Sequence, residues 1–344
     1  MKHLLHNMIT PILIIVSIIY GLIIKIRNTL YDLNYFKSHT FHKPIISIGN
    51  ITAGGTGKTP LVIYIARIIL NQGRKPGIIS RGYGRKSKGM IIVHDGNKML
   101  VDVNKAGDEP FLIGEKLKNV PIIVSNNRYE GITALIKNYF VDIIIMDDGF
   151  QHRSIKRDLN IITISGKESL KNYKLLPWGK MRESLSNIKR SNLIVYTKTN
   201  QKPMIHQTIK KLCSINYIIS NYKLKLYHYN LNQFNQNIGE PVFAFCGIAD
   251  HNSFFKSIIK LGITIKGKKY YKDHQNYSDR IIKNLFKKIK KLKLNNIITT
   301  EKDIVKLPQY FINAFQIYII KISIIVKDES KINTEIKKLF SENL

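Results

Sequence analysis

The stretch from Ser47 to Pro60 reads SIGNITAGGTGKTP, and it decides the fold of this chain. An apolar run that begins at Pro44 precedes it, and an apolar pattern with helical spacing follows it. A strand, a glycine-rich turn and a helix in this order form the setting of a phosphate-binding loop. Glycines let backbone N–H groups turn toward an anion, and the helix adds its positive N-terminal end. An ordinary glycine turn with a surface lysine is the alternative, but residue types, spacing and flanks together favour the phosphate loop.

Two side chains of this loop are expected to act on a nucleoside triphosphate. Lys58 would reach the β- and γ-phosphates, and the hydroxyl of Thr59 would ligate Mg²⁺. The loop departs from the usual pattern at its first position, where the chain has Thr52 instead of glycine. The residues predicted to bind ATP are Thr52, Ala53, Gly54, Gly55, Thr56, Gly57, Lys58 and Thr59.

A second signature is the run VDIIIMDDGFQH, from Val141 to His152. Its apolar residues predict a buried strand, and Asp147 and Asp148 follow where that strand ends. Ligand sites of open α/β sheets lie at the carboxyl ends of the strands. We expect one of the two carboxylates to hold Mg²⁺ directly or through water, as a Walker-B aspartate does. Adjacent aspartates also cap many turns, so the nearby phosphate loop is what favours the metal site.

Four further polar segments have both a structural and a functional interpretation. The basic loop Arg81–Lys86 is either a solvated turn or a site that captures an anionic substrate. The acids of Gly107–Pro110 begin a predicted helix, where the helix dipole alone favours them. The loop Leu176–Glu183 contains the only tryptophan of the chain. The segment Asp273–Gln275 precedes an amphipathic helix and could simply cap it.

The composition limits the class of protein. A chain of 344 residues is long enough for two α/β domains or one large domain. An apolar content of 44% indicates packed cores rather than disorder. The two cysteines, Cys213 and Cys246, lack the paired spacing of a zinc site or a disulfide framework, which is typical of a reducing compartment. Each is most simply a small buried apolar residue.

The net charge is +32, from 55 Lys and Arg against 23 Asp and Glu. Such an excess suggests nucleic acid or an anionic membrane surface. However, the chain is rich in Lys, Asn and Ile throughout, so compositional drift accounts for a charge that is spread over its whole length. It also lacks an aromatic RNA-binding motif and zinc-finger spacing. We therefore predict no nucleic-acid partner.

The N-terminal segment points to a membrane. From Met8 to Ile24 there is no charged residue over about 17 positions, the lower limit for a spanning helix. A signal peptide would need a small-residue cleavage site, which does not follow, and a buried core helix is the other alternative. We predict a membrane anchor, either spanning or interfacial, with the catalytic body at the cytoplasmic face, where ATP is.

Beyond this segment, short apolar strands alternate with helical stretches, which indicates a parallel sheet with helices on both faces. We predict an α/β fold of the P-loop NTPase type with a second, smaller α/β domain and an N-terminal apolar helix. The expected domains are residues 1–30 as the anchor, 31–228 as the P-loop core and 229–344 as the smaller domain. The expected strands are Ile45–Ile48, Gly77–Ser80, Met90–Val93, Ile122–Val124, Asp142–Met146, Leu159–Ile164, Leu193–Tyr196, Val242–Phe245, Asn296–Thr300 and Ile317–Ile322.

The motifs together resemble those of one family, the tetraacyldisaccharide 4′-kinases of lipid A synthesis. In chain order they are GNITAGGTGKTP, SRGYGR, GDEP, MDDGFQHR, LPWGKMRE, FCGIA, DHQNY and TTEKD. The resemblance extends from the N-terminal helix to about Lys306, and DDGFQH together with GGTGKTP is specific to the family. Thr52 agrees with the family pattern, whereas Trp178 occupies a variable position.

The resemblance implies an activity and a location. Such kinases transfer the γ-phosphoryl group of ATP to the 4′-hydroxyl of a tetraacyl glucosamine disaccharide 1-phosphate. The acyl chains of that substrate stay in the bacterial inner membrane, which would explain the apolar N-terminus. The expected cofactors are ATP and Mg²⁺, the expected partners are the lipid substrate and inner-membrane lipid, and we expect a monomer.

The resemblance also implies roles for single residues. Asp108 would be the general base, oriented or tuned by His274 from the second domain, while Lys58 neutralises phosphate charge. A guanidinium group forks well onto phosphate, so arginines near the site are candidates for binding the substrate. The expected substrate contacts are Arg81, Arg85, Glu109, Arg128, Gln151, His152, Arg182 and Glu183.

Two other classes share some of these features. A membrane-associated nucleotide switch or partitioning ATPase would have the same phosphate loop, but it would leave GDEP and DHQNY without a task. If that switch used GTP, it would need the guanine-reading Asn-Lys-x-Asp, which Thr300–Asp303 only loosely resembles. A nucleic-acid-binding protein is suggested by the charge alone.

Overall fold

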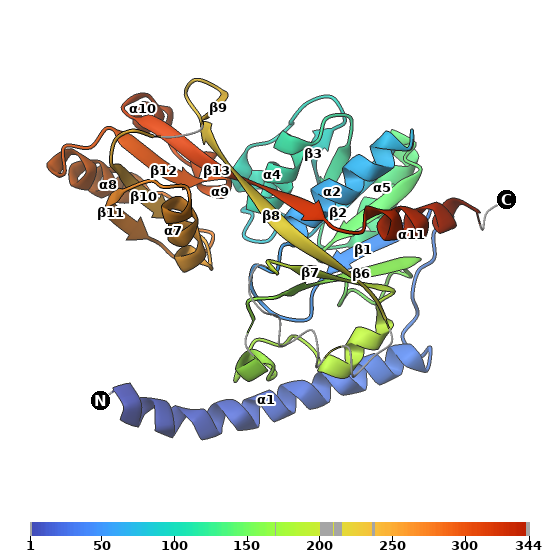
Figure 1. Cartoon of the computed structure of the whole chain (residues 1–344). Coiled ribbons are helices and arrows are strands. Elements are labelled where there is room, and N and C mark those ends of the chain that lie inside the picture. Colours follow the sequence, from blue (N-terminus) through green and yellow to red (C-terminus); the bar gives the residue numbers. More distant parts are fainter. Residues whose placement is uncertain (1, 169, 200–208, 210–214, 236–237, 342–344) are drawn as a thin grey trace.

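The computed structural model describes residues 2–168, 170–199, 209, 215–235 and 238–341. These residues form a single central sheet of 13 strands. Two lobes are built on this sheet, one at each end, and an N-terminal helix lies along the outside (Figure 1). The α/β fold class predicted from the alternation of strands and helices is confirmed.

The P-loop lobe, residues 45–199, contains the glycine loop. Its strands are β1 (Ile45–Gly49), β2 (Pro76–Ser80), β3 (Ile91–Asp95), β4 (Pro121–Val124), β5 (Ile143–Asp147), β6 (Leu159–Ser165) and β7 (Leu193–Thr197). They lie in the order β7-β6-β1-β5-β2-β4-β3, and only β3 runs antiparallel to its neighbour. Because the carboxyl ends of parallel strands meet at one edge, the loops after β1, β2 and β5 come together there.

Helices cover both faces of this lobe. One face carries α2 (Lys58–Asn71) and α4 (Asp108–Lys116), and the other carries α5 (Arg128–Tyr139). Successive strand residues point to opposite faces, so Ile145 packs in the α2 core while Ile144 packs in the α5 core. The short helix α3 (Val103–Ala106) leads into α4, and the 3₁₀ turns Leu170–Asn172 and Leu185–Arg190 lie in the loops before β7.

The second lobe, residues 238–315, continues the sheet. Its elements are β10 (Val242–Cys246), α7 (His251–Lys260), β11 (Ile265–Tyr270), α8 (Asp279–Lys291), β12 (Asn296–Thr300), α9 (Glu301–Ile304) and α10 (Gln309–Asn313). The core on the α8 face is rich in phenylalanine, and α7 packs on the opposite face. Cys246 is buried in this second core, as predicted for an apolar residue, whereas Cys213 lies outside the described residues.

Two long strands join the lobes. The strand β8 (Asn216–His228) begins parallel to β7 and then pairs antiparallel with β13 (Gln316–Val326), which in turn pairs with β12. Figure 1 shows both strands crossing from one lobe to the other. The sequence predicted β13 but not β8, because tyrosine, lysine and asparagine interrupt the apolar pattern of β8. The short strand β9 (Gln233–Asn235) folds back onto β8.

The chain returns to the P-loop lobe at its C-terminal end. Helix α11 (Glu329–Ser341) buries Ile332 and Ile336 in the same core as α2. Tyr64 of α2 also donates a hydrogen bond to Glu329 (2.5 Å). The predicted division into domains at residues 228 and 229 stays a prediction, since one sheet runs through both lobes.

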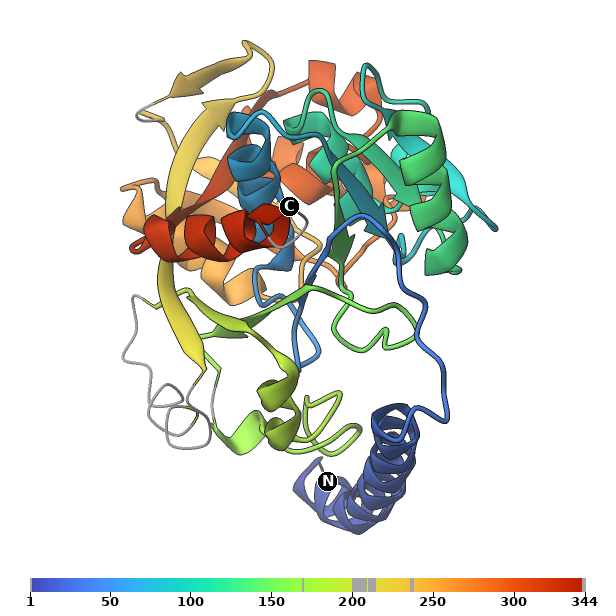
Figure 2. The same ribbon diagram turned by 90° about the vertical axis from the view of Figure 1, so that its right-hand side faces the viewer.

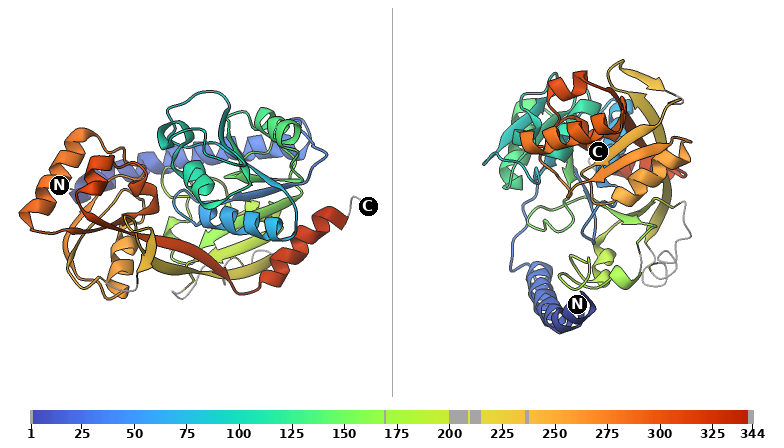
Figure 3. Two further views of the ribbon diagram at one scale, coloured as in Figure 1. Left: turned by 90° about the horizontal axis from the view of Figure 1, so that it is seen from above. Right: turned by 90° about the vertical axis from the view of Figure 1, so that its left-hand side faces the viewer.

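The N-terminal helix α1 (Lys2–Asp32) lies along the outside of the P-loop lobe, away from the hydrophobic cores (Figure 2). Seen from above, it runs past the P-loop lobe and its N-terminal end reaches beneath the second lobe (Figure 3). The segment Thr10–Asp32 contains an 18-residue window with a mean hydropathy of 1.9, and it is long and apolar enough to cross a membrane, by length and composition. Among residues 10–32, Ser17 and Asn28 are the buried ones, and both are polar.

Candidate active site

A cavity of about 1220 Å³ lies between the two lobes, at the carboxyl edge of the sheet. Its wall combines the glycine loop, the loops after β2 and β5, the start of α7 and one side of α1. The predicted site residues on this wall are Ala53, Gly54, Gly55, Thr56, Gly57, Lys58, Thr59, Arg81, Glu109, Arg128, Asp147, Asp148, Gln151, His152, Arg182 and His274. The predicted residues that lie off the wall are Thr52, Arg85, Asp108 and Glu183.

Side chains of other elements hold the glycine loop from behind. Thr197 donates a hydrogen bond to the carbonyl of Thr56 (2.7 Å), and Lys198 donates one to the carbonyl of Gly55 (2.8 Å). Gly57 has a φ of 92°, in the left-handed region, and a Cβ there would clash with the hydroxyl of Tyr222. Helix α2 begins at the next residue, so its N-terminal end opens onto the loop. This geometry is what anion binding by backbone N–H groups requires.

Asp148 lies within a cluster of positive charge. Lys58 Nζ is 3.4 Å from Asp148 Oδ1, and Arg182 Nη1 donates to both carboxylate oxygens at 2.9 Å. Burial alone would raise the pKa of Asp148, but Lys58 and Arg182 outweigh it and hold the pKa below its usual value. Asp148 therefore stays ionised and keeps Lys58 near the loop.

Asp147 has the opposite surroundings. Its Oδ2 accepts a hydrogen bond from Ser80 (2.9 Å), and its buried Oδ1 has no hydrogen-bond partner in the described part of the chain. Burial raises its pKa, and the nearby charges of Glu109 and Asp148 raise it further. Asp147 and Thr59 line the same cavity, and a carboxylate oxygen and a hydroxyl are ligands of the kind Mg²⁺ prefers. Among the described residues, no three His, Cys, Asp or Glu side chains gather into a self-sufficient metal site.

Asp108 and His274 meet across the two lobes. Asp108 is the first residue of α4, and His274 lies in the loop after β11, with a φ of 57°. His274 Nδ1 is 3.0 Å from Asp108 Oδ2, and Lys306 Nζ is 2.9 Å from the same oxygen. Burial alone would raise the pKa of Asp108, but the hydrogen bond from His274 and the charge of Lys306 lower it overall. Asp108 is thus ionised, and Nδ1 of His274 donates to it.

A second ion pair crosses the lobes beside this one. Lys302 Nζ of α9 donates to Glu109 Oε1 at 2.7 Å. The charge of Lys302 lowers the pKa of Glu109 against the effect of burial. The sequence motifs predict Glu109 as a site residue but assign no role to Lys302 or Lys306. The motif TTEKD marked this segment, but its partners on α4 lie in the other lobe.

The arginines differ in how free they are to bind a substrate. Arg85 donates to the carbonyl of Gly89 (2.6 Å) within its own loop and lies off the cavity wall. Arg128 is buried with its guanidinium on the carbonyl of Ser125, and burial lowers its pKa to about 10. Arg81 and Arg182 lie on the cavity wall, and Arg182 also contacts Asp148.

Gln151 and His152 follow the two aspartates. Gln151 Nε2 donates to the carbonyl of Asn50 (2.8 Å), which fixes the start of the glycine loop. His152 Nε2 is 3.0 Å from the hydroxyl of Ser154. Burial, helped by the charges of Arg128 and Arg157, lowers the pKa of His152 to about 4, so its imidazole is neutral at pH 7.

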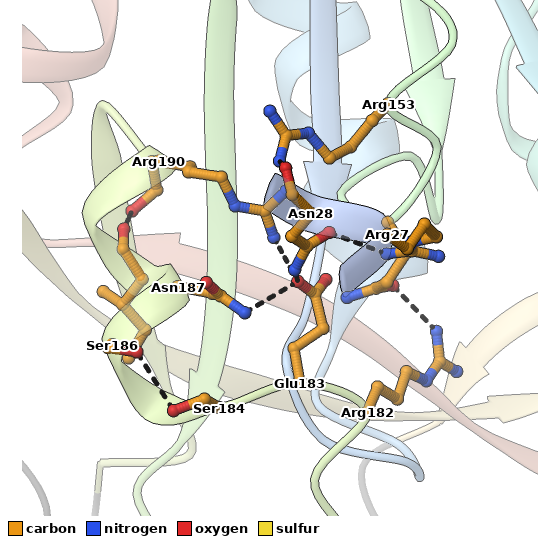
Figure 4. A network of polar contacts seen from close by, with 12 residues as sticks. Arg27, Asn28, Arg153, Arg182, Glu183, Ser184, Ser186, Asn187 and Arg190 are labelled. Carbon is orange, nitrogen blue, oxygen red and sulfur yellow. Dashed lines mark hydrogen bonds and ion pairs between the residues drawn. The ribbon is translucent and has the colours of Figure 1, made fainter. Parts of the chain in front are cut away.

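Glu183 lies in a polar network at the base of α1. Its Oε2 accepts hydrogen bonds from Asn28 (3.0 Å), from Asn187 (3.1 Å) and from Arg190. Figure 4 shows these side chains gathered around the carboxylate, with Arg153 and Arg27 beside Asn28. Glu183 is fully buried, so in this structure it fastens α1 to the loop before β7.

Three comparisons extend over nearly the whole chain. The family model described as tetraacyldisaccharide-1-P 4′-kinase matches residues 9–341. The tetraacyldisaccharide 4′-kinase of Desulfotalea psychrophila is 34% identical over 302 residues, which cover 86% of this chain and 87% of that protein. The one from Chlorobium phaeobacteroides is 37% identical over 300 residues, covering 83% of this chain and 84% of the relative.

A solved structure resembles both lobes together. It is LpxK from Aquifex aeolicus in complex with ATP, which is 31% identical and superposes with a TM-score of 0.80. The match covers 98% of this chain and 99% of that one, so it includes the cavity and the helix along its edge.

Proposed function

This chain belongs to the tetraacyldisaccharide 4′-kinase family, and from that premise we propose how its cavity performs the phosphoryl transfer. The chain is an ATP-dependent phosphotransferase with an alcohol acceptor. The reaction carries the γ-phosphoryl group of ATP to the 4′-hydroxyl of a tetraacyl glucosamine disaccharide 1-phosphate, a late step of lipid A synthesis. One observation carries the mechanism: Lys58 of the phosphate loop and His274, the partner of Asp108, share the wall of one cavity.

The glycine loop is the donor half of the site. Its backbone N–H groups and the N-terminal end of α2 would hold the β- and γ-phosphates, and Lys58 would neutralise the charge that develops during transfer. Lys58 is held only loosely by Asp148, at 3.4 Å, so a phosphate can replace that contact. Gln151 would keep the loop in place through Asn50.

Asp147, Asp148 and Thr59 would hold Mg²⁺. The unpartnered Oδ1 of Asp147 and the hydroxyl of Thr59 fit a hard cation, and phosphate oxygens and water would complete its ligands. A bound Mg²⁺ supplies positive charge to the β- and γ-phosphates. It would also keep Asp147 ionised against the burial that raises its pKa.

Asp108 is the proposed base of the acceptor half. A carboxylate positioned within hydrogen-bond reach of the 4′-hydroxyl can take its proton as the oxygen attacks phosphorus. His274 would hold the carboxylate in that position from the second lobe, through Asp108 Oδ2. The position of the base therefore depends on a contact between the two lobes.

The lipid would approach along α1. Tyr20, Ile24 and Arg27 of this helix line the same cavity as the phosphate loop, which supports a substrate whose head enters while its acyl chains remain in the membrane. We place the protein at the cytoplasmic face of the inner membrane, with α1 as its anchor and the monomer as the active form.

Arginines on the wall are the proposed contacts for the 1-phosphate and the sugars. Arg81 and Arg182 line the cavity, as do Arg128, Glu109 and His152. Arg85 and Glu183 lie off the wall, so a contact with the substrate would require their side chains to leave the partners described above.

The test is a transfer assay with the full chain in detergent. ATP labelled at the γ-phosphate is incubated with a tetraacyl disaccharide 1-phosphate, and the label is followed into lipid. We expect labelled lipid that disappears with EDTA and returns with Mg²⁺. Lys58→Ala should lower the rate by about 10² or more, because the positive charge that stabilises the transferring phosphoryl group is lost. Release of free phosphate without labelled lipid would instead indicate a nucleotide-driven switch.

A further inference from the structure

Three segments of the second lobe converge on one buried carboxylate, that of Asp303. Its Oδ2 accepts from the backbone N–H of Gly247 (3.0 Å) and from the hydroxyl of Thr300 (2.6 Å), and its Oδ1 accepts from the hydroxyl of Tyr277 (2.9 Å). Gly247 belongs to FCGIA, Tyr277 to DHQNY and Thr300 to TTEKD. Burial and Asp303 raise the pKa of Tyr277, so its hydroxyl remains a donor. A buried carboxylate with several good donors is a fixed point around which the loops are ordered.

Lys306 extends from this fixed point to the other lobe. Its Nζ is 3.8 Å from Asp303 Oδ1 and 2.9 Å from Asp108 Oδ2, and it lies 5.9 Å from the ring centre of Tyr277. Only 8% of its side chain is exposed. A buried ammonium is costly unless it is paired, so the two carboxylates determine where it lies. Lys306 does not line the cavity, so it would act on the reaction only through Asp108.

The contacts of Asp108 are unequal. His274 Nδ1 and Lys306 Nζ both lie on Oδ2, at 3.0 and 2.9 Å. Within the described residues, no hydrogen bond engages Oδ1. We propose that Lys306 is a positioning residue for the transfer: together with His274 it fixes Asp108 by Oδ2 and leaves Oδ1 for the 4′-hydroxyl. The inference rests on the proposed role of Asp108 as the base.

The charge of Lys306 should also set the pH range of the base. Burial alone would raise the pKa of Asp108, and Lys306 is one of the two groups that lower it. Without that charge the pKa of Asp108 is higher. As the pH falls, Asp108 is therefore protonated, and inactive as a base, at a higher pH than in the wild type. Other titratable groups face this pair from several elements. Asp303 and Tyr277 lie beside Lys306, Tyr83 and Asp273 lie beside His274, and Lys302 acts on both Glu109 and Asp108.

The experiment measures kcat against pH for the full chain in detergent, with ATP and tetraacyl disaccharide 1-phosphate. In Lys306→Met, the acidic limb of the profile should move up by about 1 pH unit, because a neighbouring opposite charge lowers a carboxyl pKa by that amount or more. The plateau should fall by about tenfold while KM for ATP is unchanged, since a loosened base affects the chemical step alone. Lys306→Gln keeps a donor without the charge, so it should show the same shift of the limb with a smaller loss on the plateau.

Lys116→Met is the matched control. Lys116 also forms an ion pair between the lobes, with Glu301 at 2.7 Å, but it does not touch Asp108. Its acidic limb should stay where the wild-type limb lies. The inference would be overturned if the acidic limb of kcat lay at the wild-type pH in both Lys306→Met and Lys306→Gln. It would also be overturned if Lys116→Met moved the limb as far as Lys306→Met does. If Lys306→Met fails to fold, Lys306→Gln is judged by the same limb. If the wild type transfers no phosphate to lipid, the proposed function fails instead, and the two failures are thereby distinguished.

Discussion

Three carboxylates of the site show how surroundings divide chemically identical groups. Asp147 and Asp148 are neighbours in the chain, but Asp147 is buried beside other acids, which raises its pKa, while Asp148 faces Lys58 and Arg182. Asp108, in the other half of the site, is kept ionised by donors from the second lobe. The proposed division of labour follows from these surroundings. Asp147 has an oxygen without a partner among the described residues, which suits a cation. Asp148 pairs with Lys58 and Arg182 in addition to its proposed part in the metal site, and Asp108 is available as a base.

The first prediction at the scale of the residue concerns Asp108→Ala. Turnover should fall by about 10² to 10⁴, the range in which a positioned general base contributes. ATP affinity should be unchanged, because the side chain of Asp108 contacts His274 and Lys306 of the second lobe and not the glycine loop. The transfer assay gives the first quantity and calorimetric titration with ATP gives the second.

Asp102→Ala serves as its control. Asp102 caps the neighbouring helix α3 by accepting from the backbone N–H of Lys105 (3.0 Å). Its loss should cost about 1 kcal/mol of stability and leave turnover near the wild-type value. If Asp108→Ala turned over as fast as Asp102→Ala, Asp108 would have no place in the mechanism.

At the scale of the element, α1 has two unlike sides. Toward the body it presents polar groups: Ser17 donates to the carbonyl of Leu175 (2.9 Å) and Tyr20 to that of Arg182 (2.7 Å). Away from the body it exposes apolar side chains, namely Ile12, Ile15, Val16, Ile18, Ile19, Leu22, Ile23 and Ile26. A contiguous apolar surface of this kind marks a contact with lipid or with another protein. The flanking Lys25 and Arg27 suit an anionic lipid surface.

Removal of residues 1–26 should therefore release the protein from lipid vesicles in a sedimentation assay. The truncation also deletes Ser17 and Tyr20, so a second variant is needed to separate lipid binding from packing. Replacing Ile15, Ile19 and Ile23 by serine together alters only exposed side chains and keeps both hydrogen bonds. That variant should sediment less than the wild type while remaining folded. Sedimentation of the truncated chain with vesicles would rule out α1 as the anchor.

At the scale of the whole molecule, the lobes are joined in two ways. The strands β8 and β13 form a continuous connection through their mutual hydrogen bonds. Ion pairs then close the cavity on one side, with Lys116 on Glu301 and Lys302 on Glu109, both at 2.7 Å. The strands fix the distance between the lobes, while the ion pairs hold α9 against α4, where Asp108 begins.

A double-mutant cycle on Glu109→Gln and Lys302→Met, measured by chemical denaturation, tests the contribution of these ion pairs between the lobes. Their side chains are about a quarter exposed, at 26% and 24%, so the pair is screened less than a surface pair. The coupling energy should be about 1 kcal/mol or more, as for contacting groups in one network. The pair Asp328 and Lys331 is more than half exposed and should couple by less than about 0.5 kcal/mol. Equal coupling energies in both pairs would mean that the ion pair between the lobes stabilises the protein no more than a surface pair does.

The sequence by itself determined the P-loop lobe, the pair of aspartates at the end of β5 and the apolar nature of α1. These features depend on residues within a few positions of one another: a strand, a glycine turn and a helix start, or an apolar run that ends in two aspartates. Local patterns of this kind need no knowledge of the rest of the chain. The order of the motifs was equally visible, and it was enough to identify the family.

Only the tertiary structure decided which of these motifs touch. Asp108 meets His274 and Lys306 across 166 and 198 residues of chain, and those contacts depend on how β8 and β13 align the lobes. The sequence did not reveal β8, because polar residues obscure its pattern. The strand connection between the lobes could therefore not be predicted. The charges that packing brings around them likewise give Asp147 and Asp148 opposite pKa shifts, and packing encloses Glu183 at the base of α1. Each outcome depends on the free energy of packing distant segments together, which no local pattern contains.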